Sequence, residues 1–380
     1  MADLVVRNAG RVFGYDVEGP LAIAIRNGRV EAVVSEAPVD LPELDAGGRA
    51  VIPGFVDAHT HLVFAGDRAD EFEARLAGRS YDAGGIMSTV RATRAATLDQ
   101  LVEATVRRAA ACLATGTTTI EVKSGYGLDT ATERRLLEAV AAANERTRAD
   151  LVPTFLGAHL APDPAYIDLV IDEMLPACAP LATSCDAFCD EGALPVEQAR
   201  RVLEAGRRHG LAPRIHAEEL AHTGGARLAA ELGCASADHL VHATAQDAAA
   251  LAAARVVAVL LPATSFSLRS TYAPARMLRD AGVTLALATD CNPGTSYTTS
   301  MPFVVALGCS AYGLAVDDAI RAATEGGAKA LCRDDIGHLR PGAQADLVVL
   351  DTDRWVDLAY RPGADLIHAV VKDGAVVVGP

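Results

Sequence analysis

The chain has 380 residues, of which 51% are apolar and 4% aromatic, and its formal net charge is −15. This charge disfavours nucleic acid and anionic membranes as partners, but it leaves a small anionic substrate possible. There is no apolar stretch long enough to span a membrane and no signal-peptide pattern at the start, so we expect a cytoplasmic protein.

Both ends of the chain read as β-hairpins. The runs LVVRNAGRVF and LAIAIRNGRVEAVV contain turn signals at Asn8-Ala9-Gly10 and Asn27-Gly28, and the tail HAVVKDGAVVVG contains Asp373-Gly374. Asn-Gly or Asp-Gly between strand-like runs is a strong hairpin signal. We expect the two ends, residues 1–53 and 341–380, to meet in one small β-sandwich domain. Two separate decorations on the main body are the alternative.

Short apolar runs followed by helical patterns fill the rest of the chain. Helical segments such as ATERRLLEAVAAANE separate eight runs: VIPGFVDAH, GTTTIEVKSG, ADLVPTFLGAH, CDAFCDEG, LAPRIHAEE, SADHLVHA, VVAVLLPAT and TLALATDC. Eight strand–helix alternations predict an α/β fold with a (β/α)₈ TIM-type barrel, which we place at residues 54–340. The low aromatic content suits a parallel sheet covered by helices.

The first of these runs ends in two histidines, in the stretch VIPGFVDAHTHLVFAG. Residues i and i+2 of a strand point to the same side, so His59 and His61 can direct two imidazoles at one point. A lone histidine after a strand is more often structural, but this pair favours a metal ion.

Further polar residues follow the other runs, where barrel enzymes have their active sites. Residues of this kind are Lys123, His159, His216, Glu219, His239 and Asp290. A metal site needs three or four ligands and an open position, which His59, His61, His216 and Asp290 would provide. Imidazole and carboxylate suit Zn²⁺ or iron equally, and either ion lowers the pKa of water towards about 7.

The motifs also resemble a known family. PGFVDAHTHLVF, the single histidines of the fifth and sixth runs, TDCNPG and PGAQADLVVLD are similar to the amidohydrolase superfamily. The resemblance narrows to the imidazolonepropionase family through HTHLVFAGDRADEFEARLAG, STVRATRAAT, EVKSGYGL, FLGAH, HAEE, SADHL and TDCNPGTSYTTSMP. These motifs occur in the family's order, and with the flanking β domain they cover nearly the whole chain.

This resemblance implies hydrolysis of 4-imidazolone-5-propanoate to N-formimidoyl-L-glutamate in histidine degradation, by a homodimer with one divalent metal ion, Zn²⁺ or Fe²⁺/Fe³⁺. By motif, the implied metal ligands are His59, His61, His216 and Asp290, and Lys123 is not a ligand. The implied catalytic residues are Glu219, His239 and Asp290. The implied substrate contacts are Arg68, Tyr126, His159, Glu219, Asn292, Gly294 and Thr295.

These residues suggest a mechanism. Asp290 and His239 would orient the attacking water, Glu219 would protonate the leaving ring nitrogen, and Arg68 would bind the substrate carboxylate or ring oxygen. The loop from Asn292 to Thr295 would offer an amide and free backbone N–H groups to an anion.

Each of these residues also has a structural reading. Glu219 could be a solvated carboxylate at a helix start, and Arg68 could form a salt bridge with Asp70 or Glu71. The loop from Asn292 could be only a turn.

One segment departs from the family pattern, because GRSYDAGGIMSTVRATR is short between Tyr81 and Gly85. Lid closure or substrate affinity could therefore differ from the family's.

Two other functions compete with this interpretation. One is another amidohydrolase-type enzyme, such as a nucleobase deaminase, for which the same metal ligands would serve. The other is a non-catalytic barrel that only binds metal. Arg68 and the loop from Asn292 favour a substrate with a carboxylate, and the complete set of candidate groups favours catalysis.

Overall fold

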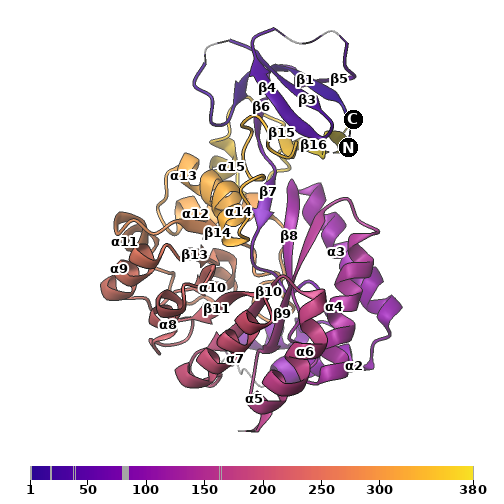
Figure 1. The fold of residues 1–380 in the computed structure, drawn as a ribbon. Helices are drawn as coiled ribbons and strands as arrows, with labels where there is room; N and C mark the ends of the chain where they lie inside the picture. Colours follow the sequence, from indigo (N-terminus) through magenta and orange to yellow (C-terminus); the bar gives the residue numbers. More distant parts are fainter. Residues whose placement is uncertain are drawn as a thin grey trace.

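The computed structural model describes residues 2–17, 19–36, 38, 40–78, 85–161, 163 and 165–379. The described strands form three sheets, and Figure 1 shows both chain ends together at one end of an α/β barrel. The predicted fold class, a (β/α)₈ barrel with an additional β domain from both ends of the chain, is confirmed. Its boundaries at residues 53/54 and 340/341 stay a prediction.

The two sheets outside the barrel combine the first and last parts of the chain. One has the order β4-β3-β1-β5 and the other β17-β16-β15-β6-β2. Apolar side chains of both sheets, such as Ile23 and Val349, are buried in one cluster. The strands are β1 Leu4–Ala9, β2 Arg11–Val12, β3 Leu21–Arg26, β4 Arg29–Val34, β5 Glu43–Asp45, β6 Ala50–Pro53, β15 Leu347–Leu350, β16 Ile367–Lys372 and β17 Ala375–Val378.

Two of the three predicted turns are hairpin turns. Asn27 and Gly28 join β3 to β4, and Asp373 and Gly374 join β16 to β17, all four with positive φ as such two-residue turns require. The hairpin expected at Asn8 is wrong, because β1 pairs with β3 and β5 whereas β2 pairs with β6. The chain crosses there from one sheet to the other.

The barrel is one parallel sheet of eight strands in sequential order, β7 to β14. They are β7 Phe55–Asp57, β8 Thr117–Lys123, β9 Asp150–Ala158, β10 Ser184–Cys189, β11 Ala212–Ala217, β12 Ser236–His239, β13 Val257–Leu260 and β14 Leu285–Leu287. Within the described residues, β7 and β14 form no ladder with each other. A single parallel bridge between Thr60 and Cys291 closes the barrel beyond their ends.

The run VIPGFVDAH is two strands rather than the one expected. Its first half is β6, which pairs with β15 outside the barrel, and its second half is β7, which pairs with β8. Gly54 lies between them, where a Cβ would come within 2.4 Å of the Thr118 hydroxyl oxygen. His59 and His61 therefore follow the strand instead of ending it.

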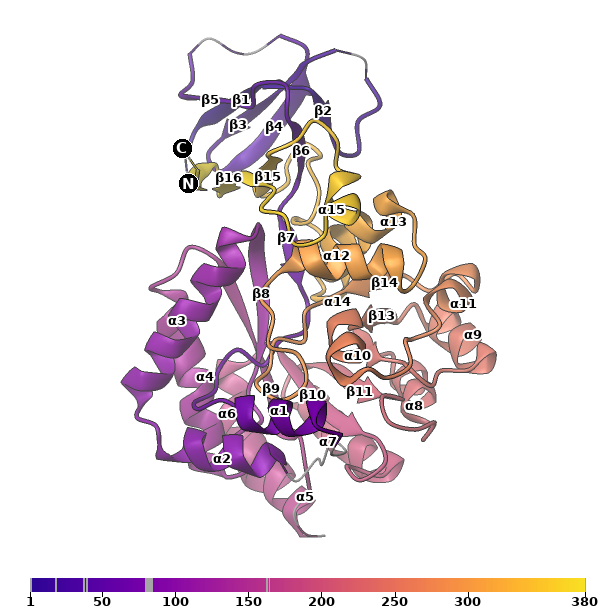
Figure 2. The same cartoon turned by 180° about the vertical axis from the view of Figure 1, so that it is seen from behind.

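Helices cover the outside of the barrel, and Figure 2 shows α1 and α2 at the end remote from the chain termini. They are α1 Ala69–Leu76, α2 Ile86–Ala95, α3 Leu98–Ala114, α4 Thr130–Asn144, α5 Tyr166–Leu169, α6 Leu175–Cys178, α7 Val196–Arg208, α8 Gly225–Leu232, α9 Ala245–Ala254, α10 Pro262–Leu268, α11 Ala275–Asp280, α12 Met301–Ser310, α13 Val316–Arg321, α14 Gly327–Ala330 and α15 Asp357–Tyr360. Short π-helical turns (Val170–Met174 and Ala322–Gly326) and a 3₁₀ turn (Ala179–Leu181) extend α5, α13 and α6.

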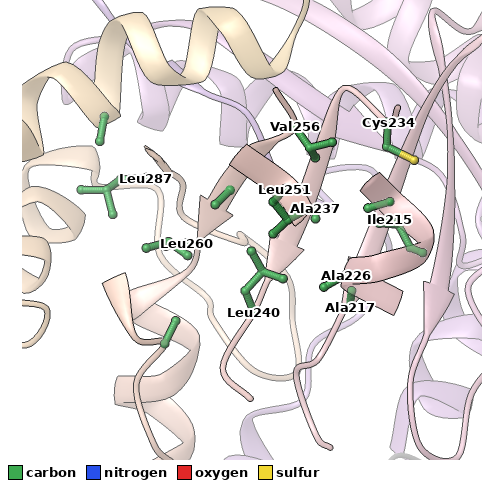
Figure 3. Close-up of a cluster of buried hydrophobic side chains, with 14 of the residues drawn as sticks. Ile215, Ala217, Ala226, Cys234, Ala237, Leu240, Leu251, Val256, Leu260 and Leu287 are labelled. Atoms are coloured by element: carbon green, nitrogen blue, oxygen red, sulfur yellow. The ribbon is translucent and has the colours of Figure 1, made fainter. Parts of the chain in front are cut away.

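Small and branched apolar side chains fill the space between strands and helices. Figure 3 shows part of this core, with Ile215 of β11, Ala226 of α8, Ala237 of β12 and Leu251 of α9. In the part of the chain that the structure describes, no helix has the length and apolar character needed to cross a bilayer.

Candidate metal centre and active site

Two imidazoles and a carboxylate converge where the barrel closes. The backbone around Thr60 is extended, so His59 and His61 face the same side, and their ring centroids are 5.4 Å apart. Each Nε2 lies 3.6 Å from Oδ1 of Asp290, which follows β14. The structure thus brings together three of the four predicted metal ligands, and their role as ligands stays a prediction.

Two more histidines complete this group. His216 of β11 has its ring 4.5 Å from that of His59, and its Nε2 is 3.4 Å from Nε2 of His61. His239, at the end of β12, has its ring 5.4 Å from that of His216. Ligand atoms lie within 4.8 Å of one another in two sets, His59–His216–His239 and His59–His61–Asp290.

The chemistry of this group suits a metal ion. Nε2 of His59 is buried and has no hydrogen-bond partner among the described residues, as expected for an atom that can bind a metal ion. Burial, together with the nearby cations, lowers the pKa of His59, His61 and His239, so these rings are neutral, the form that binds metal. The histidine and aspartate groups can thus hold a cation.

Carboxylates behind the imidazoles fix their orientation. Oδ2 of Asp238 is 2.6 Å from Nδ1 of His59, and Oδ1 of Asp186 is 3.1 Å from Nδ1 of His216. When Nδ1–H donates to a carboxylate, Nε2 presents its lone pair to a metal. Sequence reasoning gave these two aspartates no role. Asp186 lies within β10 and not at its end, whereas Asp238 is the next-to-last residue of β12.

Asp290 has its own support. The Thr264 hydroxyl donates to its Oδ2 at 2.6 Å. Burial raises the pKa of Asp290 to about 6, and the Thr264 hydrogen bond opposes that rise. Its φ of 53° is unusual for a residue with a side chain and holds the carboxylate towards the histidines.

Glu219 is beside this group and not at a helix start, because α8 begins only at Gly225. Asp190, which sequence reasoning left without a role, accepts the backbone N–H groups of Glu219, Leu220 and Ala221 and so fixes the loop. Oε2 of Glu219 lies 3.6 Å from Nε2 of His239. Burial, and then the charges of Asp290 and Asp190, raise the pKa of Glu219 well above its ordinary value.

Arg68 precedes α1 and forms a salt bridge with Glu71, one of the two partners that its structural reading suggests. Its Nε and Nη2 donate to the two oxygens of Glu71 at 2.7 and 2.5 Å. Gly294 packs directly on the guanidinium, since a Cβ there would lie 2.1 Å from Nη1. The side chain is 4% exposed, so Arg68 is held between Glu71 and the loop from Asn292.

Tyr126 and His159 form an aromatic wall. The His159 ring stacks on His61, with centroids 5.1 Å apart and an interplanar angle of 16°, and the Tyr126 ring is 5.4 Å from His159. Nδ1 of His159 is 3.0 Å from the Gly125 carbonyl oxygen. Burial, and then nearby His216, lower the pKa of His159 to about 3, so this ring is neutral.

The loop from Asn292 does not offer the free N–H groups that we expected. Oδ1 of Asn292 accepts the N–H groups of Gly294 and Thr295, both at 2.8 Å. The Asn292 amide in turn donates to the Asp290 carbonyl and the Thr295 hydroxyl. The short polar side chain closes a turn on its own backbone, which leaves the side chains of Asn292 and Thr295 at the pocket.

One pocket collects nearly all the predicted site residues. Its lining is His61, Arg68, Ile86, Tyr126, His159, Leu160, Phe188, His216, Glu219, Leu220, His239, Asp290, Asn292 and Thr295. His59 lies beneath it with no exposed surface, and Gly294 is behind Arg68. The shortened segment between Tyr81 and Gly85 lies, except for Gly85, outside the described residues.

A (β/α)₈ barrel with this histidine and aspartate group at its mouth defines an amidohydrolase-type barrel. The model of the amidohydrolase family matches residues 50–377. The chain is 48% identical to an imidazolonepropionase of Mycolicibacterium smegmatis, over 99% of this chain and 98% of that one. It is 53% identical to one of Streptomyces coelicolor, over 90% and 87%.

The chain belongs to the imidazolonepropionase family of amidohydrolases, which confirms the predicted family and the predicted class of hydrolase. Among solved structures, the fold is similar to that of a zinc-bound adenosine deaminase from Xanthomonas campestris. The TM-score is 0.74 and the identity 21%, over 100% of this chain and 93% of that one. This likeness shows the shared fold.

Proposed function

We propose that this chain hydrolyses 4-imidazolone-5-propanoate to N-formimidoyl-L-glutamate, a step of histidine degradation. The observation that carries the proposal is the lining of the pocket. Proton-transfer groups (Glu219, His239 and Asp290) share it with the guanidinium of Arg68. Cleavage of a cyclic amide that has a carboxylate tail needs both kinds of group.

One divalent cation, Zn²⁺ or iron, would be held by His59, His61, His216 and Asp290. His239 is close enough to be a further ligand, since it belongs to one of the two sets of ligand atoms. When bound, the ion supplies a Lewis acid and lowers the pKa of water towards about 7. Lys123 is no ligand in this proposal, because carboxylates surround its ammonium group.

The protein's own groups would manage the protons. Asp290 and His239 orient the attacking water and hold the proton that it loses, and His239 lies 3.6 Å from Glu219. Burial and the neighbouring charges raise the pKa of Glu219 well above its ordinary value, which favours the form that carries a proton. Glu219 can therefore donate that proton to the ring nitrogen as the C–N bond breaks, a contribution of about 10²–10⁴ in rate.

Arg68 would bind the carboxylate tail through its planar fork. Since Glu71 occupies this fork in the structure, the substrate shares or replaces that contact. Tyr126, His159, Asn292, Gly294 and Thr295 would shape the pocket around the ring and the tail. We further propose a homodimer, which light scattering on the purified protein would test.

The decisive experiment offers the metal-loaded protein 4-imidazolone-5-propanoate in parallel with guanine and cytosine. We expect turnover of the first compound only, with N-formimidoyl-L-glutamate identified by mass spectrometry. Turnover of a nucleobase would favour the deaminase alternative. Metal binding without any turnover would favour the non-catalytic barrel.

A further inference from the structure

Lys123 is a fully buried cation beneath the candidate metal centre. It ends β8, and its side chain has no exposed surface. Its Nζ is 2.6 Å from Oδ2 of Asp186, 2.7 Å from Oε1 of Glu121 and 3.7 Å from Oδ2 of Asp238. A buried charge is tolerated only with such partners, and carboxylates on several sides hold this one as an ammonium ion.

Two of these three carboxylates also contact candidate metal ligands. Asp186 bonds Nδ1 of His216, and the same Oδ2 of Asp238 that faces Lys123 bonds Nδ1 of His59. One ammonium group therefore connects the supports of two imidazoles that come from opposite parts of the chain.

The backbone of Lys123 contacts the same centre. Its N–H donates to the carbonyl oxygen of Thr60, the residue between His59 and His61, at 2.9 Å. The Thr60 hydroxyl donates to the Glu121 carbonyl at 2.6 Å. The end of β8 thus fixes both the histidine segment and the carboxylates behind it.

A second buried cation of the barrel interior, Arg214, shares two of the three carboxylates, Glu121 and Asp238. Arg214 lies 3.5 Å from Glu121 and 3.7 Å from Asp238, and it donates to the carbonyl oxygens of Ala58 and Ala330. Among the described residues, no hydrogen bond or ion pair joins Arg214 to Asp186. Only Lys123, of these two, contacts both carboxylates that orient the histidines.

We propose that Lys123 is a positioning residue of the metal centre, whose ammonium group holds Asp186 and Asp238 so that His59 and His216 present Nε2 to one cation. The proposal rests on the proposed function in one respect, that these histidines are metal ligands. Loss of such outer contacts typically weakens metal binding by about 10–100-fold.

The test measures metal affinity without using turnover. Zn²⁺ dissociation constants are determined by chelator competition for the wild type and Lys123→Met, and Co²⁺-loaded samples report ligand geometry in their visible spectra. We expect about 10–100-fold weaker Zn²⁺ binding and a changed Co²⁺ spectrum. Unchanged affinity and spectrum in Lys123→Met would overturn the proposal.

Lys372→Met is the matched control. Lys372 is also a buried lysine among carboxylates, 3.1 Å from Asp150 and 3.3 Å from Asp346, but it belongs to β16 outside the barrel. Its loss should lower the melting temperature and leave Zn²⁺ affinity unchanged. Equal loss of affinity in both variants would mean that Lys123 acts only through general stability.

A double-mutant cycle with Lys123→Gln, which keeps a hydrogen-bond donor at this position, covers the case in which Lys123→Met folds poorly. Asp186→Asn keeps the shape and an acceptor for His216, and we expect it to weaken Zn²⁺ binding by itself. If the ammonium group acts through Asp186, adding Lys123→Gln to Asp186→Asn should weaken Zn²⁺ binding clearly less than adding it to the wild type. Additive losses would overturn the proposal, whereas a wild type that binds no metal would instead overturn the proposed function.

Discussion

Glu218 and Glu219 are neighbours in the chain, yet their carboxylates have different surroundings. The oxygens of Glu218 accept backbone N–H groups of Thr223, Gly224 and Ala226, and its φ of 56° is in the left-handed region. Glu219 lies near His239 and Asp290 instead. Glu218, which has a strained backbone and a carboxylate that accepts three backbone hydrogen bonds, thus fixes the loop from which Glu219 reaches the pocket.

Replacement of Glu219 by Gln should lower kcat by about 10²–10⁴-fold, because the amide cannot supply a proton. Metal content should stay at the wild-type value.

The raised pKa of Glu219 means that the wild type loses its acid form, and hence activity, as the pH rises through that pKa. Glu219→Gln should lack this alkaline decline. Steady-state kinetics over pH, with metal analysis, checks both points, and exposed Glu191→Gln is the control.

Replacement of Gly294 by Ala should raise KM about tenfold with a smaller effect on kcat. The added Cβ would lie 2.1 Å from Nη1 of Arg68 and must displace the guanidinium from the position that we propose for binding the carboxylate tail. In an Arg68→Met background the same change should have little further effect. A full additional loss in that background would show that Gly294 acts independently of Arg68.

At the level of elements, the sequence alone predicted the barrel strands and the turns at Asn27 and Asp373. Both the spacing of apolar residues and the residue types of tight turns can be read from neighbouring positions. The sequence did not predict that VIPGFVDAH divides at Gly54, since both halves are equally apolar and only pairing partners separate them. It did predict that the imidazoles of His59 and His61 face the same side, because alternate residues of an extended backbone do so. The partners of Asp190 and Lys123 depend on packing between distant strands, which no local pattern encodes.

Helix α9 provides a test of one local element. Thr244 and Asp247 form a capping box, and Asp247 also accepts from His222 at 2.9 Å. Burial raises the pKa of Asp247, but the hydrogen bonds from Thr244 and His222 outweigh it, so the pKa is below its ordinary value. Asp247→Ala should therefore cost roughly 1–2 kcal/mol of unfolding free energy at pH 7.

The pH dependence of this cost has a definite sign. A carboxylate with a lowered folded-state pKa stabilises the protein above its unfolded pKa of about 3.9, and that stabilisation is lost as the pH falls through the folded-state value. The difference between wild type and Asp247→Ala should shrink below about pH 4. Urea unfolding at pH 7 and at several lower values measures it, with exposed Asp16→Ala as the control. A constant difference would mean that the charge of Asp247 contributes nothing.

At the scale of the whole molecule, the first and last barrel strands, β7 and β14, form no backbone ladder with each other among the described residues. A backbone bridge between Thr60 and Cys291 joins their ends, with the N–H of Asp290 donating to the His59 carbonyl and that of His61 to the Cys291 carbonyl, both at 3.0 Å. The Asp57 carboxylate adds two side-chain hydrogen bonds, from the N–H and the hydroxyl of Thr289. The proposed ligands lie on both sides of this junction, His59 and His61 on one side and Asp290 on the other. A bound ion would therefore connect the two edges of the sheet.

Removal of the metal should consequently destabilise the molecule and loosen this junction first. Binding to the folded state alone contributes about 4 kcal/mol when the free ion exceeds its Kd a thousandfold, so chelator-treated protein should melt at a lower temperature. Hydrogen exchange followed by mass spectrometry should accelerate most in residues 57–62 and 288–292. Peptides from β10, which pairs on both sides with β9 and β11, are the internal control and should change least. If both regions lost protection equally, the ion would stabilise the barrel as a whole and not its junction.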